Sequence, residues 1–156
     1  MNIAHFEPKP KIQRIGNMNE RTLALIKPDA YAARNCGKII SVIEESDLDI
    51  IGIRTLTLSS EQARSFYAVH KEKPFFEELI SYMTSGPIFA MALEGENAIE
   101  KWRNMMGATN PAKAEEGTIR KRFGTDLTHN ATHGSDAPET ARVEVDFFFK
   151  DEDLNR

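Results

Sequence analysis

The chain alternates continuous apolar runs with stripes in which apolar residues recur every three or four positions. Three runs of apolar and branched residues predict strands buried in a sheet: 22–26, 48–58 and 88–93. Four stripes predict helices: 37–45, 59–70, 74–83 and 97–106. Strands and helices that interleave in this way indicate an α/β or α+β fold, with a small sheet covered by helices.

The C-terminal segment fits two patterns. Alternate residues from Val143 to Phe149 are apolar, as in a strand, whereas Ala141, Val145 and Phe148 form a helical stripe. We favour the helix, because the Asp-Ala-Pro-Glu sequence just before the stripe is a typical helix start.

Two stretches lack this periodicity. Residues 1–20 contain two prolines and a glycine, so we predict an extended or disordered leader followed by a single domain at 21–156. Residues 107–130 form a long loop with a turn near 118–123. A loop of that length in a compact domain is usually either disordered or functional, and its basic and polar residues favour function.

Composition and charge narrow the class of protein. The chain has 156 residues, of which 40% are hydrophobic and 28% charged, as is ordinary for a soluble globular protein. Its net charge of −4 makes nucleic acid a secondary partner at most, because nucleic-acid binding rewards a basic surface. The single cysteine, Cys36, fits a reducing compartment. With no apolar run long enough to span a membrane and no secretory signal, we expect a cytoplasmic protein with no membrane partner.

The candidate chemistry centres on the sequence Asn-Ala-Thr-His-Gly-Ser-Asp at residues 130–136. His133 precedes a glycine and two short hydrogen-bonding residues, which is typical of a tight, exposed turn rather than of a packed element. A neutral imidazole on such a turn is a nucleophile near pH 7 and can carry a phosphoryl group. The alternative is a surface or hydrogen-bonded histidine, which is how we interpret His5, His70 and His129.

Three cations could hold the oxygens of a phosphate. Lys27 follows a buried strand, Arg103 lies near the end of a predicted helix, and Arg120 lies in the long loop. Each of them alone would be interpreted as a solvated surface charge. Their positions around a loop that leads to His133 favour a phosphate site.

Other candidates depend on the predicted elements. If the C-terminal segment is helical, Glu144 falls on its apolar stripe, where a carboxylate needs a partner such as the imidazole of His133; in a strand it would face solvent. Tyr67 and Phe75 fit core aromatics, although an aromatic at a cleft could stack on a nucleobase. The sequence has no Walker loop, no GxGxxG motif and no histidine pair with zinc-site spacing.

Seven short motifs follow one another along the chain: IKPD at 26–29, FY at 66–67, KPFF at 73–76, SGP at 85–87, GATNP at 107–111, GTIR at 117–120 and NATHGSD at 130–136. In this order they make residues 20–150 resemble the nucleoside diphosphate kinase family, in its short bacterial-type form. Each motif alone would be weak, but the combination is specific.

The resemblance implies a fold and an activity. The fold is a ferredoxin-like βαββαβ sandwich of the α+β class, with a four-stranded antiparallel sheet covered by helices. The activity is ping-pong transfer of the γ-phosphate of a nucleoside triphosphate to a nucleoside diphosphate through phosphohistidine, which balances nucleotide pools. The alternative is a non-catalytic, nucleotide-binding regulatory protein of the same fold.

The resemblance also implies roles for individual residues. His133 is the nucleophile, Glu144 orients it, and Ser135 belongs to the same hydrogen-bond network. The residues that hold the phosphates are Lys27, Tyr67, Arg103, Thr109 and Arg120. Asn130 binds the sugar hydroxyls together with Lys27, and the base lies between Phe75 and Leu127.

Cofactor and assembly are implied in the same way. Mg²⁺ is expected on the nucleotide phosphates, with no metal ligand from the protein. The chain is expected to form a homo-oligomer, with a tetramer favoured over a hexamer. It departs from the family pattern at Ala30 and Ala137, neither of which is a chemical group in the mechanism, and at Lys121 and Arg122, where an acidic residue is common.

Overall fold

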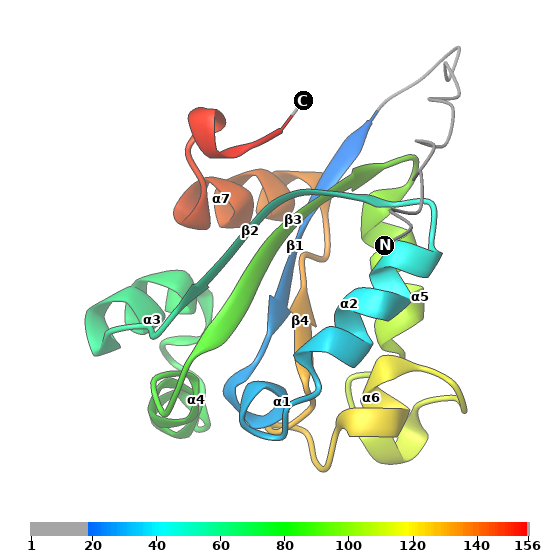
Figure 1. Cartoon of the computed structure of the whole chain (residues 1–156). Helices are drawn as coiled ribbons and strands as arrows, with labels where there is room; N and C mark the ends of the chain where they lie inside the picture. Colours follow the sequence, from blue (N-terminus) through cyan, green and yellow to red (C-terminus); the bar gives the residue numbers. More distant parts are fainter. Residues whose placement is uncertain (1–18, 156) are drawn as a thin grey trace, which may run out of the picture.

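A computed structural model of the chain describes residues 19–155 and shows an antiparallel sheet with helices on both faces (Figure 1). Within these residues the strands are β1 (Glu20–Ile26), β2 (Asp49–Leu56), β3 (Ile88–Gly95) and β4 (Thr132–Gly134). They form a four-stranded sheet in the order β2-β3-β1-β4, and every pairing is antiparallel. The predicted α+β, ferredoxin-like fold is confirmed.

Helices fill the connections between the strands and also follow the last strand. In the described part of the chain they are α1 (Pro28–Ala32), α2 (Cys36–Glu45), α3 (Ser60–Phe66), α4 (Phe76–Met83), α5 (Ala98–Met106), α6 (Ile119–Phe123) and α7 (Pro138–Phe148). Short 3₁₀ turns add η1 (Ala68–His70), η2 (Pro111–Lys113) and η3 (Asp151–Asp153). No helix among residues 19–155 has the length and apolar character needed to cross a membrane.

Alternation along β1 divides the hydrophobic core between the two faces of the sheet. Leu23 and Leu25 pack in a cluster with residues of α3, α4 and α7. Ala24 and Ile26 pack in a second cluster with residues of α2, α5 and α6. Because both faces are covered, the strand is a continuous apolar run rather than an alternating one.

Local signals for helix ends agree with the structure. Ser59 Oγ accepts a hydrogen bond from the backbone N–H of Gln62, and the Gln62 side chain accepts one from the backbone N–H of Ser59. This is the capping box expected from their spacing, and it begins α3. The C-terminal segment is the helix α7, as predicted, with Ala141, Val145 and Phe148 buried.

Several irregular segments differ from their prediction. The exposed turn expected to span 130–136 is wrong in its extent and exposure, because Thr132–Gly134 form the strand β4, the chain turns around Ala131, and Ala131 and Thr132 are fully buried. The long loop at 107–130 contains η2 and α6. The predicted leader falls on residues 1–18, outside the described residues, and on Asn19 and Glu20, where β1 begins. Residues 28–32, where proline was expected only to end a strand, form α1.

Candidate active site

One cleft of about 600 Å³ brings together most of the residues predicted to act. Those that line it are Lys27, Tyr67, Phe75, Arg103, Thr109, Arg120, Leu127, Asn130, His133 and Glu144. They come from the end of β1, the end of α3, the start of α4, α5, the segment from 107 to 130, β4 and α7. Ser135 is fully buried and reaches the cleft only through its contact with Glu144.

The backbone of β4 holds His133 in place. His133 pairs with Leu25 of β1, and its carbonyl oxygen accepts a 3.2 Å hydrogen bond from Nε1 of Trp102 on α5. Gly134 lies against the same indole, where a Cβ atom would be 2.6 Å from Trp102 Cδ1. The glycine after the histidine is therefore explained by the close approach of the indole.

Glu144 and Ser135 fix the imidazole of His133. His133 Nε2 lies 2.8 Å from Glu144 Oε1, which also accepts a 3.0 Å hydrogen bond from Ser135 Oγ. Ser135 Oγ accepts a 3.2 Å hydrogen bond from the backbone N–H of Leu23. A carboxylate oxygen can only accept, so the neutral ring carries its proton on Nε2 and its lone pair on Nδ1. Nδ1 is the nitrogen available to a ligand.

Two aromatic side chains border the same imidazole. The ring of Phe66 meets that of His133 edge to face at 5.4 Å between centroids, and Tyr67 does so at 6.2 Å. These contacts limit rotation of the imidazole, which lies in the cleft with 22% of its side chain exposed. The FY motif at 66–67 contains Phe66, but the sequence assigned no role in the site to this residue.

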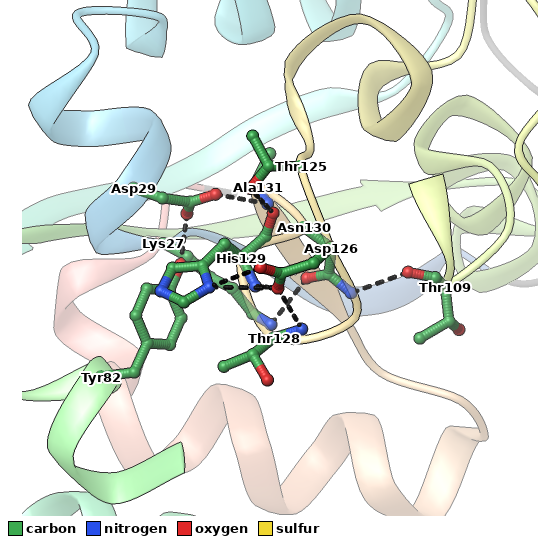
Figure 2. A network of polar contacts seen from close by, with 10 residues as sticks. All are labelled: Lys27, Asp29, Tyr82, Thr109, Thr125, Asp126, Thr128, His129, Asn130 and Ala131. Atoms are coloured by element: carbon green, nitrogen blue, oxygen red, sulfur yellow. Dashed lines mark hydrogen bonds and ion pairs between the residues drawn. The ribbon is translucent and has the colours of Figure 1, made fainter. Parts of the chain in front are cut away.

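Lys27 and Asn130 form a buried pair on the floor of the cleft. Lys27 Nζ donates a 2.8 Å hydrogen bond to Asn130 Oδ1, and Asn130 Nδ2 donates to the backbone oxygen of Thr109 at 3.0 Å (Figure 2). Burial, and then the positive charge of Arg120, lower the pKa of Lys27 to about 8, against the opposing effect of Asp29. An anion bound next to this lysine would stabilise its charged form.

Arg120 is anchored by backbone oxygens on two sides of the cleft. Its Nη1 donates to Gly107 O and its Nη2 to Thr132 O, both at 3.0 Å. Burial, and then the charge of Arg103, lower the pKa of Arg120 to about 10. Arg103 lies on the exposed side of α5, so the cleft combines a buried and an exposed guanidinium.

The hydroxyl of Tyr67 gives an independent indication of a ligand. Tyr67 lines the cleft, yet its buried hydroxyl oxygen has no hydrogen-bond partner within the described part of the chain. Burial, and then the charge of Glu144, raise the pKa of Tyr67. The hydroxyl thus stays a donor, and a phosphate oxygen would satisfy it.

Two exposed apolar side chains line the mouth of the cleft. Phe75 is 47% exposed and Leu127 is 61% exposed, which is unusual for side chains of this kind. His70, interpreted from the sequence as a residue without a ligand, also lines the cleft between Tyr67 and Phe75. His129 does not line it; its ring pairs with Asp126 and is 43% exposed.

An imidazole that lines the same cleft as cationic and hydroxyl side chains is suited to receive a phosphoryl group. The apolar mouth of the same cleft is suited to a nucleobase. Fold and cleft together are those of a nucleotide phosphotransferase.

Comparison with known proteins identifies the family of this chain. The sequence model of the nucleoside diphosphate kinase family matches residues 20–154. The nucleoside diphosphate kinase of Desulfotalea psychrophila is 55% identical over 83% of this chain and 95% of its own length. That of Syntrophotalea carbinolica is 57% identical over 86% of this chain and 98% of its own. The chain belongs to the nucleoside diphosphate kinase family and is an enzyme that transfers phosphate between nucleotides.

Solved structures agree. The nucleoside diphosphate kinase of Aquifex aeolicus superposes on this structure with a TM-score of 0.86 and is 40% identical in sequence. The match covers 88% of this chain and 100% of that chain. The Halobacterium salinarum enzyme, solved in complex with CDP, has the same TM-score and identity and covers 89% of this chain and 93% of its own.

Some residues around the cleft were not identified from the sequence. Asp29 and Tyr82 form a hydrogen bond beside Lys27, although only the motif containing Asp29 had been recognised. Tyr82 lies off the apolar stripe of its helix and yet is buried. A buried tyrosine usually has a partner for its hydroxyl, but the partner's position depends on the fold.

Proposed function

We propose that His133 Nδ1 is the atom that carries phosphate from a nucleoside triphosphate to a nucleoside diphosphate. The observation that supports this most strongly is the hydrogen bond between His133 Nε2 and Glu144, which leaves the lone pair on Nδ1 of an imidazole that lines a cleft with three cationic side chains. The complex of the Halobacterium salinarum relative with CDP supports a nucleotide as the ligand.

The first half of the reaction transfers phosphate to the protein. The lone pair of Nδ1 attacks the γ-phosphorus, and the bond from that phosphorus to the β–γ bridging oxygen breaks. The nucleoside diphosphate leaves with the bonding electron pair on that oxygen. The ring becomes more positive during the attack, and Glu144, at 2.8 Å from Nε2, stabilises it electrostatically.

The second half reverses these steps with another nucleotide. A β-phosphate oxygen of the incoming nucleoside diphosphate attacks the phosphorus, and the phosphorus–nitrogen bond breaks. Its electron pair returns to Nδ1, so the imidazole ends neutral and ready for another cycle. No proton has to leave Nε2 in either half.

The nucleotide is positioned by the remaining residues of the cleft. Phosphate oxygens accept hydrogen bonds from the Tyr67 hydroxyl and from the cations Lys27, Arg103 and Arg120, and Thr109 adds a further hydroxyl. Asn130 with Lys27 binds the sugar, and the base lies between Phe75 and Leu127. Apolar contacts to the faces of a base do not distinguish one base from another, so we propose that the cleft accepts different bases.

Mg²⁺ is proposed to reach the cleft on the phosphates of the nucleotide. The cationic donors of the cleft suit phosphate oxygens, and a Mg²⁺ ion often keeps phosphate and water ligands. Among residues 19–155, no three histidine, cysteine, aspartate or glutamate side chains gather closely enough to hold a metal ion. When bound, the ion neutralises phosphate charge.

A labelling experiment tests the function. Incubation with a γ-labelled nucleoside triphosphate is expected to give a protein-bound phosphate that is labile in acid and stable in base. Any nucleoside diphosphate should then discharge the label as the corresponding triphosphate. Protein that binds nucleotide without becoming labelled would instead support the regulatory alternative.

Lys27 gives nucleotide binding a predictable pH dependence. Its pKa of about 8 means that the amine is largely neutral at about pH 9 in the free protein. Phosphates raise that pKa because they favour the charged form, so binding at about pH 9 should take up nearly one proton. Calorimetry in two buffers of different ionisation enthalpy measures this uptake. Lys27→Arg, which stays protonated, should lose it; equal uptake by that variant would contradict the role of Lys27.

Assembly, compartment and domain organisation complete the proposal. We propose a homo-oligomer, with a tetramer favoured over a hexamer, as the resemblance to the short bacterial-type form of the family implies. Sedimentation measures the mass of the oligomer directly.

A single cysteine supports a cytoplasmic protein. Residues 21–156 are proposed to act as a single domain.

A further inference from the structure

The chain makes a strained turn between two residues of the proposed site. Ala131 is fully buried and has a φ of 71°. The backbone N–H of Thr132 donates to the carbonyl of Asn130 at 2.8 Å, which closes a three-residue turn around Ala131. A γ-turn with positive φ is rare and strained for a residue other than glycine. Strain of this kind often accompanies a function.

Asp29 holds this turn from the side of α1. Its Oδ2 accepts a 3.1 Å hydrogen bond from the backbone N–H of Ala131, and its Oδ1 accepts one from the hydroxyl of Tyr82 (Figure 2). Burial, and then the hydrogen bond to Asp29, raise the pKa of Tyr82, so its hydroxyl remains a donor. On the other side, the backbone N–H of Lys27 donates to Ala131 O at 2.9 Å.

The turn sets the relation between the two halves of the cleft. Before it, the Asn130 side chain bridges Lys27 Nζ and Thr109 O. After it, the chain enters β4, in which His133 is the second residue. If the turn relaxed, Asn130 and His133 would move relative to each other, and a shift of about 1 Å between a bound substrate and a nucleophile can cost up to 100-fold in rate.

We propose that Asp29, fixed by Tyr82, is a positioning residue that keeps the turn at Ala131 closed. Through this turn it sets the distance between the nucleotide held by Asn130 and the nucleophile His133. The inference rests on the proposed roles of those two residues. In this proposal Asp29 does not contact the substrate.

Asp29→Asn tests the inference, because an amide has nearly the same shape but only one acceptor oxygen for two donors. We expect kcat/KM to fall about 10-fold, with KM for the nucleoside diphosphate raised and kcat lowered. The matched control is Asp47→Asn, which neutralises a carboxylate in an exposed ion pair with Lys101. This control should keep wild-type values.

Rescue by glycine separates positioning from general stability. Glycine adopts a positive φ without steric cost, so Ala131→Gly should close the turn even without Asp29. In the Asp29→Asn background it should restore most of the lost kcat/KM and return KM toward the wild-type value. If Asp29→Asn folds poorly, Tyr82→Phe provides the second variant, with a smaller change in the same direction and the same rescue.

Three results would overturn the inference. The first is a kcat/KM for Asp29→Asn within about twofold of wild type. The second is a loss that Ala131→Gly leaves unchanged. The third is a smaller fraction of enzyme that can be labelled, with KM unchanged, because misfolding alone would produce that result. Wild-type protein that forms no phosphohistidine would instead contradict the proposed function.

Discussion

His133→Ala is expected to abolish labelling by γ-labelled nucleoside triphosphate and to lower kcat by at least about 10⁴-fold. The substitution removes the only atom to which the phosphoryl group is transferred in the proposed reaction, while leaving the cations of the cleft in place. Nucleotide affinity should therefore change little. Retention of the label in this variant would sink the assignment of the nucleophile.

The chain offers a matched control for this variant. His129 also has a carboxylate on one ring nitrogen, since Asp126 Oδ1 lies 3.0 Å from its Nδ1, but it does not line the cleft. His129→Ala should accept phosphate from the triphosphate and return it to a diphosphate. If both variants lost the label to the same extent, lining the cleft would not be what distinguishes His133 from His129.

Glu144→Gln is expected to slow both half-reactions about 100-fold without preventing them. Glutamine keeps the shape of the side chain and one acceptor for Nε2, but it removes the negative charge that stabilises the ring during attack. Single-turnover labelling should show slow formation of phosphohistidine and a nearly unchanged final amount. The loss should therefore appear in kcat rather than in KM.

Glu139→Gln is the control on the same helix. Glu139 lies in the first turn of α7 and is exposed to solvent, so its charge is far less effective than that of a carboxylate 2.8 Å from the ring. Equal labelling rates in the two glutamine variants would contradict the orienting role of Glu144.

The elements with strong periodicity could be predicted from the sequence because burial imposes the pattern. Both faces of β1 are covered, which explains its continuous apolar run, and one face of α7 is buried, which explains its stripe. Glu144 was identifiable for the same reason. A carboxylate on an apolar stripe requires a partner, and the structure places His133 there.

The missed features depend on contacts between distant residues. β4 has three residues without an apolar pattern, and it is a strand only because β1 lies beside it. The need for Gly134 comes from the indole of Trp102 on another element. Likewise, no local pattern indicates that Asp29 meets Ala131, which is 102 positions away in the chain. Such pairs follow from the topology.

The position of the phosphate on the imidazole of His133 tests the central claim most directly. After reaction with γ-labelled nucleoside triphosphate, the protein can be hydrolysed in base and the two isomers of phosphohistidine separated. Because Glu144 occupies Nε2, we predict that the label is on Nδ1. Label on Nε2 would contradict it, since that nitrogen could react only if its hydrogen bond to Glu144 were broken.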